Sequence, residues 1–534
     1  MIRECDAVVI GAGHHGLVAA ALLADAGWDV IVLDARSKVG GAVASTTIDG
    51  FVVDEFSSNH PLGKASPVLR DLELERHGLT WVDHRPSVVH VADEDDGAGS
   101  AIESTPEETA AALDADHVGD GDAWLKMCTG WERVREPLLH ALLSGWPPVR
   151  AGAGLARRLG AAGLLDFARF ALLPSEQMGR EWFGGQRARD LLAGNAAHAD
   201  VSPLAPVSGM MAFIMTMLAQ DVGFPTPRGG SGELAGALAR RAQVAGADVE
   251  LDTAVAGITV TAGRADGVQL ADGSRIRARR AVVADVSATA LYRGLLPADE
   301  VPPGLLARLE RFVWDPPTLK LNLQLSSTMP WLAANARRAA VIHAGASSDT
   351  MPRWHLEIAM GRVPDKAFSL VGQMTTADPT RSPAGTESLW AYTHLPVDSV
   401  DPVGANTASL RSLESMFDRL APGWRDIEQG RWLQTPQDLE AANANLVDGA
   451  LGAGTTQLFQ QGPWRPVMGL GGPITHIDGL YLGSAATHPG GGVHGGAGFN
   501  AARAALRDAR WWSKPIGRSA TRVQRMLHRQ DPDF

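Results

Sequence analysis

The chain has 534 residues, of which 45% are hydrophobic and 20% are charged, and its formal net charge is −12. This balance excludes a fibrous or wholly disordered protein. An acidic chain without a basic block is a poor partner for nucleic acid, so we expect none. The two cysteines, Cys5 and Cys128, are too few for a disulfide framework, a Cys-x-x-Cys redox pair or a zinc cluster, and we expect no metal site.

The distribution of apolar residues indicates the cellular compartment of the protein. No run of about 18 apolar residues predicts a membrane-spanning helix. A strand is expected to begin near Asp6, which leaves no room for a charged, apolar and cleavable leader. We therefore expect a cytoplasmic protein.

Residues 6–33 predict a strand, a tight turn, a helix and a second strand. The run 7–10 is short and apolar, as in parallel strands that are covered on both faces. The alanine- and leucine-rich run 17–26 predicts a helix that ends at Gly27, and 30–33 predicts the next strand. This order is a βαβ unit.

The middle of the chain changes from helical to strand-like patterns. Thr105 is expected to cap a helix, with Pro and Glu after it, and helical sequence extends to about residue 174. Strand-like runs return between 225 and 300. The run Thr318–Leu325 alternates strictly, which predicts a half-buried antiparallel strand. Further strands are expected near 368–374 and 388–394.

This order of elements predicts an α/β fold with two domains that are interleaved along the chain. The first is a discontinuous cofactor domain of residues 1–85, 225–300 and 465–510. The second is a substrate domain with a helical lid, built from residues 86–224 and 301–464. Residues 511–534 form a basic tail that we expect to be irregular.

The first chemical motif is a glycine pattern between the first strand and the first helix. Gly11 permits a tight turn, Gly13 lets a pyrophosphate approach bare backbone, and Gly16 lets helix and strand pack closely. The free N–H groups of the helix N-terminus attract the phosphates. Asp34, at the end of the second strand, would hold the ribose diol. His15 lies at a variable position of this loop and is a candidate cofactor-binding residue, with a structural role as the alternative.

The second motif follows directly. The string Asp34-Ala35-Arg36, with Gly40-Gly41 four residues further on, resembles the Glu-x-Arg-x-x-x-Gly-Gly string of two-domain flavoproteins. The arginine would neutralise charge beside the dinucleotide, and the glycine pair would let backbone pass close to phosphate. Ala42 stands where many relatives have Arg, so no side-chain contact is assigned there.

The third motif is the glycine-rich stretch 483–500, in which five of the seven residues 490–496 are glycine. So much bare backbone must admit a bulky group. An alanine-rich helix follows, and its N-terminus would stabilise the negative charge of a reduced flavin. A flexible linker is the alternative, but a strand and a helix frame the segment and it is not rich in serine.

Together these motifs resemble the phytoene-desaturase family of FAD oxidoreductases, with most likeness to its pyridine nucleotide-disulfide oxidoreductase domain-containing protein 2 branch. The resemblance implies a Rossmann-type FAD-binding domain of the amine-oxidase type with an inserted α+β substrate domain. It also implies that Val255 contacts adenine through its backbone, that the Gly483 region holds the ribityl phosphate, and that Gly492 and Val493 face the flavin. The residues that carry it lie at 9–20, 40–42, 227–230, 435–440, 465–466 and 487–493.

The resemblance implies hydride transfer from a C–H bond of a lipophilic substrate to flavin N5, with oxygen, a quinone or a protein as the final acceptor. The branch name suggests a disulfide reductase, but the chain has no cysteine pair for that reaction. It also has no second glycine fingerprint for a nicotinamide domain. Two alternatives stay open: a redox-neutral isomerase that needs reduced FAD, and a flavin-bound interaction protein with little turnover.

His60 and His488 are the candidate catalytic residues. Both lie in stretches that pass the flavin ring in relatives, and either could act as a general base. Packing or structural hydrogen bonding is the alternative for each ring.

Two further stretches bear on the substrate. The methionine-rich run 210–218 suits an irregular lipophilic ligand, but plain core packing is the alternative. The basic amphipathic run 155–170 would suit peripheral membrane contact or, alternatively, a solvated lid helix.

Overall fold

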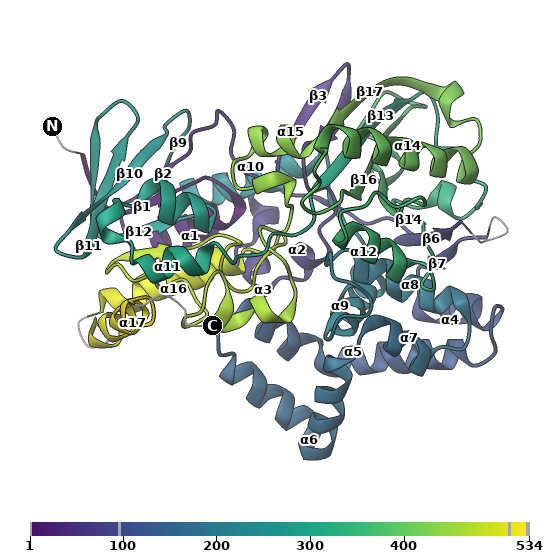
Figure 1. Ribbon diagram of the computed structural model, residues 1–534, viewed down its shortest axis with the longest axis horizontal. Helices are drawn as coiled ribbons and strands as arrows, with labels where there is room; N and C mark the ends of the chain where they lie inside the picture. The colour runs from purple at the N-terminus through teal and green to yellow at the C-terminus, as the bar shows by residue number, and fades with distance from the viewer. Residues whose placement is uncertain (1–2, 94–97, 511–513, 530–534) are drawn as a thin grey trace.

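The computed structural model describes residues 3–93, 98–510 and 514–529. Its strands fall mainly into two seven-stranded sheets, which lie toward opposite ends of the molecule in Figure 1. Two short two-stranded sheets accompany them: the hairpin of β3 (Ser45–Ile48) with β4 (Phe51–Asp54), and the pair of β5 (Trp81–Val82) with β8 (Thr226–Pro227).

The first sheet combines a parallel layer with an antiparallel extension. Five strands, in the order β18-β12-β1-β2-β9, run parallel, and β10 and β11 extend the sheet from the first half of β12. The bounds are β1 (Arg3–Ile10), β2 (Val30–Leu33), β9 (Asp248–Glu250), β10 (Val255–Thr261), β11 (Arg264–Leu270), β12 (Arg275–Ala284) and β18 (Leu480–Leu482).

Helices cover both faces of this sheet. Three of them share one core with it: α1 (His14–Asp25), α10 (Ser231–Val244) and α16 (Gly496–Ala509). The other face packs against α11 (Pro303–Leu309). The runs 7–10, 30–33 and 281–284 of β1, β2 and β12 are buried on both faces and therefore read as continuous apolar runs, which the sequence revealed. The edge strand β9 is partly exposed and has no such run.

The second sheet has the order β17-β13-β16-β15-β14-β6-β7, and only its β14–β6 pair is parallel. Consecutive residues along a strand of this sheet face opposite layers. Val88 and Val341 pack on a helical layer, whereas Val89 and Ile342 pack under α14 (Pro402–Leu420). The bounds are β6 (Val88–Ala92), β7 (Ser100–Ile102), β13 (Thr318–Leu325), β14 (Val341–Gly345), β15 (Ser369–Gln373), β16 (Glu387–His394) and β17 (Glu428–Gln434).

The helical layer begins where the sequence predicts. The Thr105 side chain accepts a hydrogen bond from the Glu108 N–H at 3.1 Å, and the Glu108 side chain accepts one from the Thr105 N–H at 3.2 Å, which confirms the predicted cap. The layer contains α4 (Pro106–Asp114), α5 (Asp120–Leu143), α6 (Val149–Leu172), α7 (Ser175–Trp182), α8 (Gln186–Ala197) and α9 (Ser208–Asp221). Helix α6 projects from the body of the molecule (Figure 1).

The remaining helices are short connections or lie near the C-terminus. They are α2 (Pro61–Ala65), α3 (Pro67–Arg70), α12 (Met351–Ala359), α13 (Met374–Ala377), α15 (Pro436–Ala442) and α17 (Lys514–Leu527). The expectation of an irregular tail was wrong for α17, which lies beside α16. Residues 511–513 and 530–534 of that tail lie outside the described residues. Within the described ranges, no helix is both long and apolar enough to cross a membrane.

The residues that pack on the first sheet extend past the predicted domain boundary at residue 300. Leu305, Leu309 and Phe312 belong to the core of that sheet. The α/β class with two sheet-based halves is confirmed, and the other domain boundaries stay a prediction.

Strand β13 departs from the prediction in its burial. It is antiparallel to β16 and β17 as expected, but all of its residues are buried. The polar face is covered by the β3–β4 segment: Lys320 Nζ donates to the Asp54 carbonyl at 2.5 Å and Gln324 Nε2 donates to the Ile48 carbonyl at 3.1 Å. Strict alternation showed which residues share a face, but not that a second layer covers the polar one.

A buried ion pair joins that covering segment to the second half of the chain. Arg381 donates to the Asp54 carboxylate at 2.6 Å, and neither side chain is exposed to solvent. The same carboxylate accepts from the Ser45 hydroxyl at 2.7 Å and from the Ser231 N–H at 2.8 Å. The guanidinium and these donors hold the pKa of Asp54 below its usual value, despite burial.

We expect Arg381→Met to lower the free energy of unfolding by about 3–5 kcal/mol, because it leaves a buried carboxylate without its cation. Unfolding in guanidinium chloride, followed by tryptophan fluorescence, measures this. Arg158→Met is the matched control, since its pair with Glu136 is exposed and should change stability little. Equal losses in the two variants would contradict the role of the buried pair.

Candidate active site

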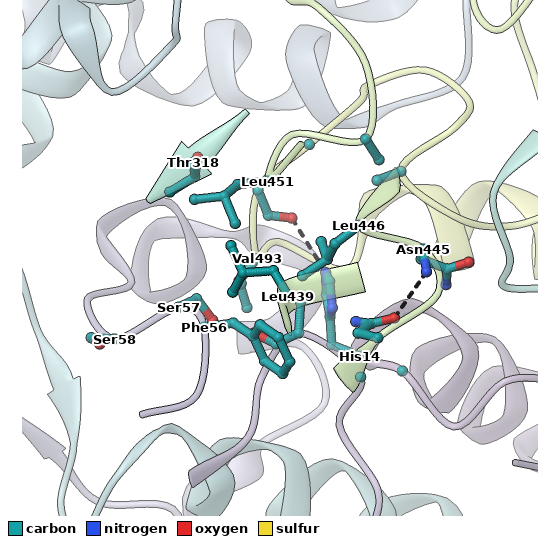
Figure 2. A pocket seen from close by; sticks show the side chains of 18 of the residues that line it. His14, Phe56, Ser57, Ser58, Thr318, Leu439, Asn445, Leu446, Leu451 and Val493 are labelled. Carbon is teal, nitrogen blue, oxygen red and sulfur yellow. Dashed lines mark hydrogen bonds between the residues drawn. The ribbon is translucent and has the colours of Figure 1, made fainter. Parts of the chain in front are cut away.

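A cavity of about 270 Å³ lies between the two sheets and receives residues from both. Figure 2 shows Leu439, Leu446 and Val493 gathered beside His14 in this cavity. Its wall includes three backbone segments that the sequence analysis singled out, at Gly13, at Gly41-Ala42 and at Gly491–Val493. The motifs are far apart in the chain, and the fold brings them to one place.

Bare backbone is required in the first glycine loop. A Cβ on Gly11 would lie 2.8 Å from the Asp285 carbonyl oxygen, and Gly11 has a φ of +97°. A Cβ on Gly13 would lie 2.5 Å from Asp285 Oδ2, and one on Gly16 would lie 2.1 Å from the Gly11 carbonyl oxygen. Helix α1 starts at His14, so its free N–H groups lie at the cavity.

Asp34 lies at the end of β2, as predicted. Its carboxylate accepts hydrogen bonds from the Ala12 N–H at 2.7 Å and from the Arg36 N–H at 2.8 Å. The Asp34 carbonyl accepts from the Thr253 N–H at 2.8 Å, which brings the start of β10 and Val255 next to Asp34-Ala35-Arg36. Asp34 and Val255 do not line the cavity itself.

The second glycine pair is held by Arg36. Its guanidinium donates to the Gly41 carbonyl at 3.2 Å and to the Glu55 carboxylate at 3.2 Å. Gly40 has a φ of +113°, and a Cβ there would lie 2.1 Å from the Val43 carbonyl oxygen, so no other residue fits the turn. Gly41 and Ala42 then line the cavity.

The third glycine stretch closes the cavity from the side of α16. Gly492 has a φ of +111°, and a Cβ on Gly491 would lie 2.5 Å from the Gly452 carbonyl oxygen. Gly483 does not line the cavity. It packs between β12 and α16, where a Cβ on Gly483 would lie 3.0 Å from a methyl carbon of Val283. The residues after it, Ser484 to Ala486, line the cavity instead.

Two neutral histidines lie at this wall. The Nε2 atom of His14 is 3.3 Å from the Gly492 carbonyl oxygen, and burial lowers the pKa of His14 to about 4. Burial also lowers the pKa of His15, whose two ring nitrogens are buried without a hydrogen-bond partner. Unpartnered nitrogens beside bare backbone and a helix N-terminus fit a bound dinucleotide, which supplies polar partners.

Sequence reasoning missed Asp285, which follows β12 and lines the cavity. Its carboxyl group accepts from the Gly16 N–H at 2.8 Å at the start of α1. Burial raises the pKa of Asp285 to about 7, the negative charge of Asp34 acts in the same direction, and the Gly16 hydrogen bond opposes them. The signal available in the sequence was an acid directly after the buried strand 281–284.

Lys320 was also missed, although a lysine within an alternating apolar strand is an unusual residue. Its Nζ donates to the carbonyls of Asp54 at 2.5 Å and Phe56 at 3.4 Å, and the residue lines the cavity. Burial lowers the pKa of Lys320 to about 8, against the attraction of Asp54 and Glu55. The ammonium group of Lys320 therefore loses its proton more readily than that of an exposed lysine.

The second sheet and α9 supply an apolar wall. Trp390 and Tyr392, on β16, stack with their ring centroids 5.9 Å apart. Met215 is the methionine of the run 210–218 that lines the cavity, whereas Met210 and Met217 belong to the helical core. Core packing therefore holds for Met210 and Met217, and contact with a lipophilic ligand stays a prediction for Met215. Phe224 and Val341 complete this wall.

Neither predicted catalytic histidine lines the cavity. His60 Nε2 lies 2.9 Å from the Ser231 hydroxyl, and His488 packs edge-on against Trp146 with centroids 6.0 Å apart. Burial lowers the pKa of each ring to about 4. Their catalytic role stays a prediction, and the geometry favours a structural one.

Comparison with known proteins agrees with this site. The family model described as flavin containing amine oxidoreductase matches residues 16–506. The "Pyridine nucleotide-disulfide oxidoreductase domain-containing protein 2" of Rattus norvegicus is 28% identical, over 95% of this chain and 94% of that protein. A limonene dehydrogenase subunit of Castellaniella defragrans is 24% identical, over 98% and 99% of the two chains.

A desaturase and a solved structure are also similar over most of their length. The "zeta-carotene-forming phytoene desaturase" of Myxococcus xanthus is 27% identical, over 91% of this chain and 90% of that protein. The crystal structure of an oxidoreductase from Methanosarcina mazei shares the fold, with a TM-score of 0.62 at 16% identity over 94% of this chain and 99% of that one. The chain therefore belongs to the flavin-containing amine oxidoreductase family, and its cofactor is FAD.

Proposed function

We propose that the protein is an FAD-dependent dehydrogenase or desaturase that oxidises a lipophilic small molecule at a C–H bond. The observation that carries this proposal is a cavity that joins the glycine loops to an apolar wall. When bound, FAD supplies a hydride acceptor beside that wall. The chain itself binds the cofactor, holds the substrate and excludes water.

The residues around the glycine loops fit FAD. The bare backbone of Gly13, Gly41 and Gly492 leaves room for phosphates and flavin, and the N-terminus of α1 offers N–H donors. We assign the ribose to Asp34 and the adenine to the backbone of Val255. Arg36 acts through the Gly41 carbonyl, which it holds in place.

The wall beyond the loops suits an apolar substrate. Among the described residues that line the cavity, Asp285 is the one carboxylate, and it is bound to the start of α1. The wall formed by Met215, Phe224 and Trp390 therefore offers no anion for a charged amine. The names of two relatives, a limonene dehydrogenase and a phytoene desaturase, support the same class of substrate.

Lys320, on β13, lines the cavity and carries N–H donors there. Its side chain titrates near neutral pH. Its carbonyl partners at Asp54 and Phe56 hold Nζ in place between the halves. From that position it can orient a polar atom of the bound cofactor or exchange a proton with one.

Gly13→Ala should lower the flavin content of the purified protein at least tenfold, because the new Cβ overlaps Asp285 Oδ2 in the phosphate loop. The ratio of flavin to protein absorbance measures this. Gly130→Ala is the matched control, since no atom lies within 4 Å of its Cβ position and full flavin content is expected. Full flavin content in Gly13→Ala would contradict the site.

Protonation of Asp285 should favour FAD. Below pH 7 this carboxyl is mostly neutral, and as the pH rises through about 7 its negative charge repels the pyrophosphate. We therefore expect FAD to bind more weakly at pH 8.5 than at pH 6, as measured by fluorescence titration of the apoprotein. Asp285→Asn should remove most of this difference. An unchanged pH dependence in that variant would show that another group causes it.

An apolar donor such as limonene should bleach the flavin band anaerobically, whereas NADH should not. Met215→Gln should slow bleaching at low donor concentration by about tenfold, because it places an amide in the apolar wall. Met211→Gln, on the same helix but away from the wall, is the control. Rapid bleaching by NADH would contradict the proposal and favour an isomerase or reductase.

A further inference from the structure

Three segments of the chain contain no acidic residue and meet on one side of the molecule. They are residues 144–158 at the start of α6, the loop 456–475, and α17 with the two residues after it, 514–529. The chain has 60 acidic residues among 534, so their absence from these segments is a local feature. Figure 1 shows α6 and α17 along the same lower edge of the molecule. We call the surface of these segments the acid-free face.

Packing contacts join the three segments. The Trp146 ring lies on the loop: a Cβ on Gly462 would be 3.2 Å from it, and a Cβ on Gly471 would be 2.9 Å from it. The loop reaches α17 at Gly469, where a Cβ would lie 2.6 Å from Gln524 Oε1. The acid-free face is therefore one continuous surface, although its parts are hundreds of residues apart in the chain.

The loop exposes large apolar side chains. Phe459 is 56% exposed and Trp464 is 49% exposed, and Trp146 beside the loop is 43% exposed. The one charged residue of the loop, Arg465, is buried and donates to backbone carbonyls. The other exposed apolar residues here are Val149, Leu458, Met468 and Leu470. A monomeric protein rarely leaves so many neighbouring apolar groups in water, so such a patch marks an interaction site.

Helix α17 places cations beside this patch. Its Gly517, Thr521 and Gln524 are buried against the body of the protein. Its exposed side carries the apolar residues Ile516, Val523 and Met526, and with them Arg518, Arg522 and Arg529. A helix that presents arginines together with apolar side chains suits the boundary of an anionic membrane.

The start of α6 supplies further positive charge. Arg150 and Arg157 are exposed, and Arg158 is paired with Glu136 of α5. On the other side of the face, Asp508 lies beneath α17 and accepts from Arg507. Each of these two acids is bonded to an arginine, so they do not cancel the charge of the other arginines.

We propose that the acid-free face docks the protein on an anionic lipid bilayer. A bilayer offers both kinds of partner that the face needs: acyl chains for Phe459 and Trp464, and phosphates for the guanidinium groups. A tryptophan ring, with an apolar body and a polar N–H, suits the boundary between them. The rest of the surface carries the excess of acidic residues, and its repulsion from the same lipids determines which side docks.

A second copy of the chain is a poorer partner for this face. In a dimer with twofold symmetry, the same patch of each copy takes part in the contact. The arginines of α6 and α17 would then meet the arginines of the other copy. Like charges that are brought together in a contact weaken binding, so the charge of the face favours lipid.

Docking also brings the cavity close to the bilayer. Leu451 and Ala453, which line the cavity, lie a few residues before the loop, and Trp146 packs edge-on against His488, shortly before Gly491. An apolar donor dissolved in the bilayer then has a short path to the cavity. This consequence rests on the proposed function, whereas docking itself does not.

Flotation with lipid vesicles tests the docking without any substrate. The full-length, flavin-loaded protein should float with vesicles of equal parts phosphatidylcholine and phosphatidylglycerol, and about tenfold less with phosphatidylcholine alone. Raising the salt concentration from about 0.1 M to about 1 M shortens the Debye length from about 10 Å to about 3 Å, and this should release most of the protein.

Two substitutions test the two components of the face. Phe459→Ser should weaken binding to the anionic vesicles about tenfold, because no ring then enters the acyl boundary at this position. Arg522→Ala should weaken it about fivefold, the contribution expected of one arginine near an anionic surface. Leu356→Ser and Arg411→Ala are the matched controls. Both side chains are exposed, Leu356 to 57%, but they lie on α12 and α14, away from the acid-free face (Figure 1).

Each contrary outcome overturns the proposal. No flotation with anionic vesicles, or equal flotation with both kinds of vesicle, would show that the face does not bind anionic lipid. Equal effects in the variants and their controls would show that another surface binds. A dimer in solution that Phe459→Ser dissociates would assign the face to a second copy. Should Phe459→Ser not fold, Trp464→Ser takes its place.

The docking and the proposed function fail separately. Flotation uses no donor, so its result stands even if no apolar donor reduces the flavin, an outcome that would contradict the proposed function alone. If a donor reduces the flavin but the protein does not float, the proposed function stands and the docking is wrong.

Discussion

The geometry of the site depends on the buried Asp54 carboxylate. It binds Arg381 from the second half of the chain and the Ser231 N–H at the start of α10, which packs on the first sheet. The carbonyl of the same residue receives Lys320 from β13. One residue thus ties both sheets to the segment between them. A buried carboxylate is costly without its partners, so loss of Arg381 would leave an uncompensated charge next to Lys320, which lines the cavity.

A second constraint is the exclusion of charge from the cavity. Burial keeps the rings of His14 and His198 neutral, brings the pKa of Lys320 down to about 8 and brings that of Asp285 up to about 7. In each case burial shifts the pKa toward the uncharged form, although Lys320 still carries its proton at pH 7. The proposed apolar substrate would meet the flavin there in poorly hydrated surroundings, and the groups that titrate near neutrality, Asp285 and Lys320, are the ones able to exchange a proton.

Local patterns predicted parts of both halves well. The apolar runs of β1 and β2, the glycines after them and the cap at Thr105 each depend on neighbours within a few residues, so periodicity and turn chemistry reveal them. The same reasoning failed for β13, whose polar face is covered by β3 and β4 from far away in the chain. It also failed for α17, where a basic sequence folds as a helix against α16.

The sequence by itself determined the family, the FAD cofactor and the backbone loops that fit it, because glycine at a fixed spacing is a local requirement of phosphate binding. Only the tertiary structure decided which side chains line the cavity. His60 and His488 lie in the right segments, yet their rings point into packing, whereas Lys320 and His198 come from segments without a motif. Whether a side chain faces a cavity depends on the layer that packs over it, and that layer comes from residues hundreds of positions away.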